Sequence, residues 1–341
     1  MTPKSHPPLA QRLLQGLGWL LLGALAWHLG RWGLWLAEFS PDPQACQALQ
    51  HTGACWGVVP AKWGNLLFGH YPQEAWWRPA VWVLLCVALY LAAWWRCPPR
   101  LLCGAGVVAM AAGVWLMGGG LGLPSVPSTA WGGLPLTLII ALGSYLLSWP
   151  VALALALARR SSWRQLSWPA TVCIEAARGV PLVTLLFMAA FLLPLALPEP
   201  DSLNLLQRAM AAMTLFSAVY LAEVLRSGLQ TVPAEQSEAA SILGLGWWGT
   251  QQRVVLPQAM RAVLPALTGH AIGLFKDGSL VMVVGLHELT GGLSLSLGGD
   301  PLWRPFYFEA YLAVGAVYAL CCFGLSALGR RLEQHWVMPQ S

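Results

Sequence analysis

The sequence predicts an all-α membrane protein that crosses the bilayer with about eight transmembrane helices. Of its 341 residues, 57% are hydrophobic and only 10% are charged, whereas a soluble domain carries about 25% charged residues. A chain so poor in charge cannot cover a water-facing surface, and a lipid environment explains the composition. The twenty Trp residues agree with this interpretation, because indole rings favour the membrane–water interface.

Eight apolar stretches account for the predicted spans, since each spanning helix needs about 20 mostly apolar residues. They cover residues 17–36, 79–95, 101–117, 133–158, 171–197, 208–227, 262–285 and 309–329. We expect each stretch to be a continuous helix, because lipid cannot form hydrogen bonds with open backbone groups.

The cations predict how these spans are oriented. If the N-terminus lies in the cytoplasm, twelve Lys and Arg residues fall on that side and five on the other. The twelve are Lys4, Arg12, Arg96, Arg100, Arg159, Arg160, Arg164, Arg226, Arg253, Arg261, Arg330 and Arg331. The positive-inside rule then places both termini in the cytoplasm of a bacterial inner-membrane protein. Residues 1–36 also resemble a signal peptide, but their apolar run is long for a signal, so we prefer an uncleaved first span.

Two domains are expected. Residues 1–124 form an N-terminal three-helix membrane extension with an external loop at 39–78, and residues 125–341 form a second membrane domain with a cytoplasmic loop at 231–258. The external loop contains little that predicts a folded domain. Its two cysteines, Cys46 and Cys55, face an oxidising space if this side is a periplasm. We predict that they form a disulfide, with two unrelated free thiols as the alternative.

The sequence carries no recognisable catalytic site. It has no Gly-x-x-x-x-Gly-Lys-Ser/Thr loop, so we expect no nucleotide site in this chain. His287-Glu288 begins a zinc-protease pattern, but Gly291 stands where the second His is needed. No group of His, Cys, Asp and Glu has metal-site spacing. We therefore expect no catalytic residue, cofactor, metal or nucleic-acid partner, and an intramembrane enzyme is a remote alternative.

The sequence of loop 231–258 predicts a short helix, a glycine that ends it (the glycine stop) and a second short helix. Pro233 suits a first helical turn, and Gly244 suits the left-handed residue that ends a helix. Pro257 limits the second helix. Ala239 and Ala240 keep one flank small, so that a partner surface can approach closely, and Ala240 would then tolerate a bulky side chain poorly.

The loop resembles the cytoplasmic loop of ATP-binding-cassette (ABC) importer permeases. That family has Glu-Ala-Ala, three residues, Gly, nine residues, an aliphatic residue, one residue and Leu-Pro. The positions are filled here by Glu238, Ala239, Ala240, Gly244, Val254, Leu256 and Pro257. The resemblance implies that this helix, with Leu243, docks into a groove of an ATPase subunit and transmits its closure. The alternative is the short amphipathic cytoplasmic helix that any polytopic protein can carry.

Three other segments resemble the polar amino-acid, or histidine-permease-like, branch of that family. They are Glu175-Ala-Ala-Arg178-Gly-Val-Pro181, Tyr220-Leu-Ala-Glu223-Val-Leu-Arg226 and Lys276-Asp277-Gly-Ser279-Leu280. Val180 and Gly278 replace the usual Thr of the first and third segments. The similarity covers about residues 128–336. With the three-span extension and the cysteine pair, the chain looks most like the M-type permease of general L-amino-acid transporters.

The resemblance implies a type I permease core built from the last five helices, which carries an L-amino acid from periplasm to cytoplasm. It implies a periplasmic amino-acid-binding protein, two ATPase subunits that bind ATP and Mg, and a second homologous permease subunit within the lipid bilayer. A heterodimer is favoured over two copies of this chain. The nearest alternative is the same type of importer for another small polar solute, such as a polyamine or an opine.

Charged residues near the predicted spans are candidates for the substrate pathway or a gate. Glu175 and Arg178 lie three residues apart on a helix and can pair, and Glu223 and Arg226 repeat that spacing. Interfacial anchoring is the alternative for both pairs.

A third charged group lies deeper in the seventh span, where charges usually face a cavity or a partner. It consists of Lys276 and Asp277, with Ser279 beside them. One of the two charged residues can line the pathway while the other pairs with a neighbouring helix, and a purely structural pair is the alternative. We expect His270, in the same span, to be a satisfied packing residue.

Overall fold

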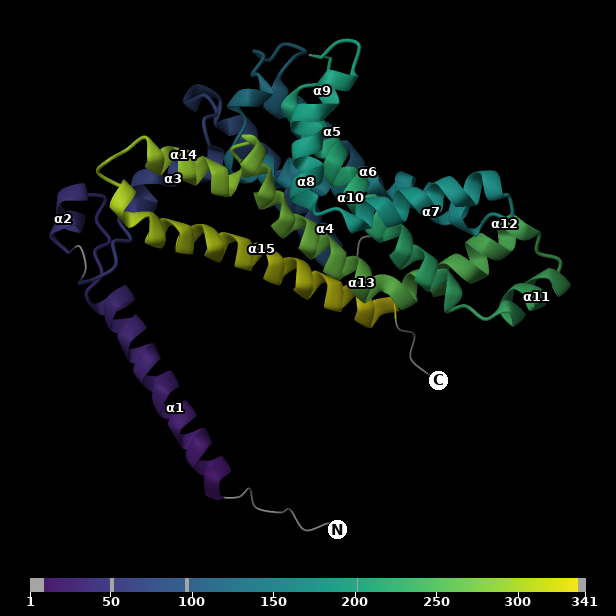
Figure 1. The fold of residues 1–341 in the computed structure, drawn as a ribbon, viewed down its shortest axis with the longest axis horizontal. Helices are drawn as coiled ribbons and strands as arrows, with labels where there is room; N and C mark the ends of the chain where they lie inside the picture. Colours follow the sequence, from purple (N-terminus) through teal and green to yellow (C-terminus); the bar gives the residue numbers. More distant parts are fainter. Residues whose placement is uncertain (1–8, 50–51, 96–97, 201, 337–341) are drawn as a thin grey trace. The chain divides into compact units, whose positions relative to one another are not determined.

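The computed structural model describes residues 9–49, 52–95, 98–200 and 202–336. These residues form helices and connecting loops and contain no β-strand, which agrees with the predicted all-α class (Figure 1). Lys4 and Arg96, which counted toward the predicted orientation, lie outside the described residues.

The α-helices follow one another along the whole described chain. They are α1 (Leu9–Gly30), α2 (Pro43–Ala48), α3 (Val58–Phe68), α4 (Trp77–Trp94), α5 (Pro99–Gly118), α6 (Gly133–Arg160), α7 (Arg164–Gly179), α8 (Leu182–Phe187), α9 (Leu193–Ala196), α10 (Leu205–Gln230), α11 (Ala234–Ile242), α12 (Trp247–Thr250), α13 (Leu256–Asp277), α14 (Leu289–Gly298) and α15 (Tyr307–Trp336). Three π-helical segments also occur, namely η1 (Arg31–Trp35), η4 (Met188–Leu192) and η5 (Gln251–Val255). Four short 3₁₀ segments complete the set: η2 (Gln73–Ala75), η3 (Ser128–Ala130), η6 (Gly278–Val284) and η7 (Arg304–Phe306).

Seven helical stretches among the described residues are long and apolar enough to cross a membrane. They are Leu13–Trp35, Gln73–Trp94, Leu101–Gly118, Gly133–Arg160, Leu205–Gln230, Trp247–Val284 and Arg304–Gln334. Each overlaps one of the predicted spans. An eighth span is present if a bent helix pair is counted as one, so the prediction of about eight membrane helices is confirmed.

The predicted span at 171–197 is the exception, because it is not a continuous helix. Arg164–Gly179 and Leu182–Ala196 meet at an angle of 106°. The break falls at Val180, whose φ of −106° and ψ of 131° are extended. The ring of Pro181 disfavours helical backbone at the residue before it. The expectation of one straight span is therefore wrong here, and α7 is a separate helix.

The described chain folds into two compact units, which are Met1–Trp63 with Ser296–Ala313 and Gly64–Leu295 with Val314–Ser341. The boundary expected at residue 124 is not a packing boundary. Helices α4 and α5 both pack against α6 in the second unit. One buried cluster contains Trp82 on α4 together with Leu136 on α6. Packing therefore does not separate residues 1–124 from 125–341. That division stays a prediction, which rests on where the sequence begins to resemble the permease family.

In the first unit, residues 36–49 and 52–63 form a folded segment that we call the disulfide segment. A disulfide joins Cys46 and Cys55, whose Cα atoms are 5.4 Å apart and whose side chains are fully buried. The backbone N–H of Cys55 donates to the carboxylate of Glu309, with N and O 3.2 Å apart. The sequence predicted no folded structure here, because compact packing of this kind depends on a partner about 250 residues away.

Two further contacts hold the disulfide segment. The indole N–H of Trp56 donates to the carbonyl of Gly33 at 2.7 Å, and Lys62 forms an ion pair with Asp300 at 2.6 Å. The hydrogen bond and charge of Lys62 lower the pKa of the Asp300 carboxyl. The segment is thus fixed by a covalent bond, a charge pair and buried hydrogen bonds.

In the second unit, α10 packs against both α6 and α13. Small residues occupy the shared core, including Ala152 and Ala156 on α6 and Ala218 and Ala222 on α10. Small side chains at such contacts let helix backbones approach closely, which is how membrane helices gain packing energy. The three helices therefore form a bundle from which the loop 231–258 extends (Figure 1).

Candidate functional site

The first helix of loop 231–258 has the predicted start and stop. Pro233 is the residue before α11, and Gly244 has a φ of +81°. The N–H of Leu245 donates to the carbonyl of Ala240 at 3.1 Å, and the N–H of Gly244 to that of Ser241 at 3.0 Å. This pair of hydrogen bonds is the Schellman motif, which ends helices at a left-handed glycine. The predicted glycine stop is confirmed.

The second half of the loop differs from the prediction. Pro257 does not end it, because α12, η5 and α13 run on as one helical stretch from Trp247 to Val284. The N–H of Leu256 bonds to the carbonyl of Gln251, five residues back, which is π-helical spacing. A proline inside an α-helix lacks an N–H and clashes with the carbonyl four residues back. The wider turn before Pro257 accommodates both effects, so the chain enters α13 without a break.

The exposed face of α11 is not the one expected. Ala240 is only 4% exposed, and α11 packs against η5 of the same chain. The expectation that Ala240 meets a partner is therefore wrong, since its small side chain is needed inside the loop. Ile242 and Leu243 are instead 85% and 82% exposed, while Glu238 and Ala239 are also exposed. The side chains that a partner can reach lie at the C-terminal end of α11.

Two further exposed aromatic residues were not singled out from the sequence. Trp247 and Trp248 begin α12 and are both exposed, with their ring centroids 4.6 Å apart. The signal was available, because a Trp-Trp pair directly after Gly246 is unusual in a water-facing loop. Two motif positions in the second half of the loop are less exposed: Leu256 is 37% exposed, and Val254 is half-buried.

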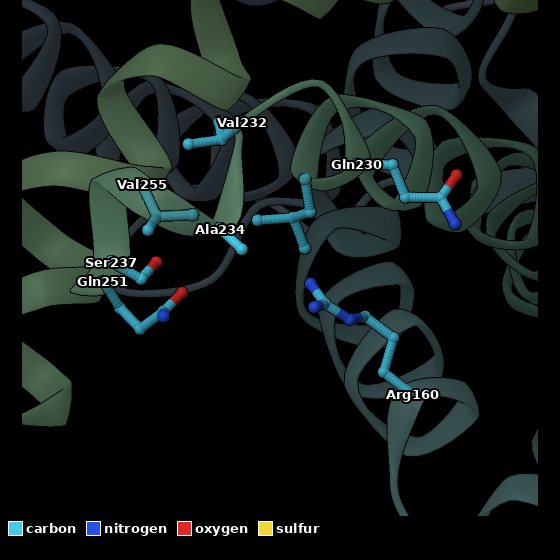
Figure 2. A pocket seen from close by; sticks show the side chains of 8 residues that line it. Arg160, Gln230, Val232, Ala234, Ser237, Gln251 and Val255 are labelled. Atoms are coloured by element: carbon cyan, nitrogen blue, oxygen red, sulfur yellow. The ribbon is translucent and has the colours of Figure 1, made fainter.

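A hollow of about 300 Å³ lies where the loop joins the bundle. Figure 2 shows Arg160 on one side of it and Ser237 and Gln251 on the other. It is lined by Arg160, Leu229, Gln230, Val232, Ala234, Ser237, Gln251 and Val255. These residues come from the ends of α6 and α10, from α11 and from η5, with Val232 in the link between α10 and α11. The hollow therefore marks the junction of four helical elements.

A cluster of charged side chains lies near this junction. Arg159 forms ion pairs with Glu175, at 2.9 Å, and with Glu223. Glu223 also accepts from Arg226, at 2.9 Å from Nη2 and 3.1 Å from Nε. The expected pairing of Glu223 with Arg226 is confirmed. The expected pairing of Glu175 with Arg178 is wrong, because Arg159 from α6 takes the Glu175 carboxylate.

A second chain of contacts starts at Arg178. Its guanidinium lies 5.6 Å from the ring centroid of Tyr220, and that ring stacks on His270 at 6.4 Å. His270 Nε2 lies 2.9 Å from the hydroxyl of Ser217, which donates to Ser148 at 3.0 Å. His270 therefore has a hydrogen-bond partner in the helix bundle, as expected of a satisfied packing residue.

The third charged group stands apart from this cluster. Lys276 is exposed and Asp277 is half-buried at the end of α13, and Ser279 donates to the carbonyl of Lys276 at 2.8 Å. Neither charge joins an ion pair among the described residues. Lys276 lies twenty residues beyond Leu256, or about 30 Å along a helix. The structure therefore brings the groups of Glu175 and Glu223 together at Arg159, whereas none of the ion pairs of the described residues joins Lys276 or Asp277 to them.

The comparison with known families decides the class of protein. Residues 150–337 match the family described as the inner membrane component of binding-protein-dependent transport systems. The chain belongs to this family. As such an inner membrane component, it is a multi-pass inner-membrane protein and a transporter subunit rather than an enzyme.

Two relatives of this inner membrane component match most of its length. The inner membrane amino-acid ABC transporter permease protein YhdY of Escherichia coli K12 is 38% identical over 289 residues, which cover 84% of this chain and 78% of the relative. The glutamate/glutamine/aspartate/asparagine transport system permease protein BztC of Rhodobacter capsulatus is 32% identical over 379 residues, which cover 93% and 87%.

A solved structure also resembles this inner membrane component. The crystal structure of an amino acid ABC transporter with histidines has a chain that is 28% identical, with a TM-score of 0.53. The match covers 60% of the present chain and 92% of the other. The predicted all-α fold with an ABC importer permease core is confirmed by this likeness together with the family match.

Proposed function

We propose that this permease imports L-amino acids from the periplasm to the cytoplasm. The observation that carries the proposal is loop 231–258, where the Glu238-Ala-Ala spacing coincides with exposed Ile242 and Leu243. The names of YhdY and BztC, both permeases of amino-acid transport systems, support the substrate class. A polyamine or opine importer of the same type is the second candidate.

The partners follow from the same proposal. A periplasmic binding protein delivers the amino acid, and two ATPase subunits bind ATP and Mg and drive alternating access. A second homologous permease chain completes the pore within the lipid bilayer. Ile242 and Leu243 provide the apolar contact with the ATPase, because exposed apolar side chains at the end of a polar helix mark a docking surface.

The proposed direction of transport requires loop 231–258 to face the cytoplasm, with both termini on that side. A periplasm-dependent reporter should therefore be active when inserted at Asp300 and inactive at Gln236. Activity at Gln236 would contradict the proposal, because the loop would then face away from ATP.

The continuous helix suggests how movement passes from the loop into the membrane. α11 packs against η5, and η5 continues into α13 without a break. A displacement of α11 by the ATPase would therefore push on the helix that contains α13. This contact bypasses the link of Gly244 to Gly246, which joins α11 to the start of the continuous helix.

The proposed function is tested by reconstitution. The chain is co-expressed with its neighbouring ATPase, second permease and binding protein, and the complex is placed in liposomes with internal ATP. We expect ATP-dependent uptake of radiolabelled glutamate, glutamine, aspartate or asparagine, and none without the binding protein. Uptake of putrescine or octopine with no uptake of any L-amino acid would favour the second candidate instead.

We also propose that Asp277 belongs to the pathway. It is half-buried at the end of α13 and joins none of the ion pairs of the described chain. Asp277→Asn keeps the volume and removes the charge, so uptake should fall while the complex still assembles. Normal uptake by this variant would remove Asp277 from the pathway.

A further inference from the structure

Glu223 is the residue that holds the charged cluster together. Its Oε1 accepts from Arg159, at the end of α6, and its Oε2 accepts from Arg226, on its own helix α10. Arg159 uses its other terminal nitrogen to reach Glu175 on α7. The Arg159 guanidinium on α6 therefore contacts α10 through Glu223 and α7 through Glu175.

The cluster has two halves, namely the contact of Arg159 with Glu223 and its contact with Glu175, and water screens them to different extents. The side chains of Arg159 and Glu223 are 23% and 18% exposed, whereas that of Glu175 is 55% exposed. Exposed ion pairs contribute little because solvent and salt screen them. The contact of Arg159 with Glu223 is therefore the stronger half, and the contact with Glu175 the weaker half.

Helix α7 is attached to α6 and α10 by buried apolar side chains, including Ile174 and Ala177, and by the exposed contact of Glu175 with Arg159. The bend of 106° after Gly179 separates its direction from that of α8, so α8 does not hold it as a continuous helix would. α7 packs against α6 and α10, and Arg178 adds a contact with the ring of Tyr220 on α10. The position of α7 is thus set mainly from the side, by residues of α6 and α10.

The cluster lies directly beside the root of loop 231–258. Arg160, the next residue after Arg159, lines the hollow together with Ser237 of α11 and Gln251 of η5 (Figure 2). Glu223 lies seven residues before the end of α10 at Gln230, which is about two helical turns. A movement of the loop therefore reaches the cluster through the end of α10 and through the adjacent arginines of α6.

We infer that Glu223 is a positioning residue for energy coupling, which fixes the end of α6 to α10 so that the two move together when the loop is displaced. The inference rests on the proposed function and deepens it. Without this carboxylate, the loop and α10 can move while the end of α6 stays behind. ATP hydrolysis then continues, but fewer hydrolysis events lead to transport.

The test uses the complete complex in liposomes and measures amino acid transported per ATP hydrolysed. Glu223→Gln should lower this ratio about tenfold, the effect of losing one strong charge-assisted hydrogen bond, with assembly of the complex and ATPase binding unchanged. Glu223→Asp, which keeps the charge on a shorter side chain, should recover part of the ratio. Glu175→Gln is the matched control, because it removes the same charge from the exposed half, and it should change the ratio by less than about twofold.

Two outcomes overturn the inference. One is an unchanged ratio in the assembled Glu223→Gln complex, and the other is an equal loss in Glu175→Gln. If Glu223→Gln does not assemble, Arg159→Gln removes the same contact from its other end together with the exposed contact to Glu175, and its ratio relative to that of Glu175→Gln decides in the same way. A wild-type complex that transports no amino acid refutes the proposed function, whereas a working wild type with an unchanged variant ratio refutes only the role of Glu223.

Discussion

The disulfide segment and loop 231–258 both connect membrane spans and both contain a short helix, but they differ in how much of each is buried. The disulfide segment buries Cys46 and Cys55 completely, together with Ala54 and Val58, and leaves Phe39 and Trp63 exposed. The loop buries little more than Ala240, Thr250 and Val255 and leaves Ile242 and Leu243 open.

Contact with lipid does not explain why the apolar side chains of Ile242 and Leu243 are exposed. Glu235, Gln236 and Glu238 are exposed on the same helix, and such polar groups are costly in a bilayer. The disulfide segment is thus held by a covalent bond and by contacts within the described chain, whereas the apolar end of α11 is the surface that we propose an ATPase covers.

The first prediction breaks the proposed docking surface. Leu243→Asp should weaken binding of the ATPase about 30-fold or more, because a central apolar contact of an interface is worth about 2 kcal/mol or more. The permease itself should insert and unfold as the wild type does, since Leu243 has few contacts of its own. Affinity is measured by titrating the purified ATPase onto the detergent-solubilised permease.

Gln236→Asp is the control for that variant, because it adds the same charge to the same exposed helix without removing an apolar side chain. An equal loss of affinity in both variants would mean that charge, and not the apolar end of α11, determines binding.

The next effect concerns the disulfide segment. Cys46→Ser should lower its free energy of unfolding by about 2–3 kcal/mol, the chain-entropy estimate for a closed loop of this length. Cys103→Ser, at an exposed free cysteine, should change it little. The bond itself is checked by alkylating the folded protein without reductant, followed by mass spectrometry. Labelling of both thiols would show that the native protein lacks the disulfide.

A third prediction compares two glycines of the loop. Gly244→Val places a β-branched residue at a φ of +81° and should destabilise the loop by about 1–2 kcal/mol. Gly246→Val should be tolerated, because Gly246 has a φ of −66° and an added Cβ would meet nothing within 4 Å. Hydrogen exchange of α11 measures the difference, and similar exchange rates in the two variants would contradict it.

The smallest effect is pH-dependent and lies at Asp300. Its folded pKa is below the unfolded value of about 3.9, so the stability from its pairing with Lys62 is present above that pH and is lost as the pH falls through the folded pKa. Asp300→Asn should therefore lower stability by less than about 1 kcal/mol at pH 7. The difference from wild type should shrink at pH 3, as measured by thermal unfolding, and a difference that grows there would refute the assignment.

Local rules predicted the parts of the molecule that depend on nearby residues. The stop at Gly244 follows from the conformational freedom of glycine after a helical turn, and the spans follow from the length of apolar runs. The Glu223 and Arg226 pair was also predictable, because its partners are three residues apart on one helix.

Contacts between distant residues were not predictable in the same way. Arg159 takes the partner expected for Arg178 because α6 and α7 pack side by side, which no spacing within α7 indicates. The break before Pro181 was signalled by the proline, but the apolar run 171–197 concealed it. The pairing of Lys62 with Asp300 joins residues more than two hundred positions apart.

The π segment Gln251–Val255 has a consequence for how this chain tolerates deletions. A π turn holds one residue more than the α-helical turn that it replaces. Removing a single residue there would let α12 and α13 join as an ordinary α-helix, and side chains upstream would keep about their present direction, because an α turn covers the same rotation with one residue fewer. Removing a residue from the regular part of α13 would instead rotate the two sides by about 100° relative to each other. The π segment is thus the place in this helical stretch where a one-residue deletion should disturb the direction of Trp247 and Trp248 least.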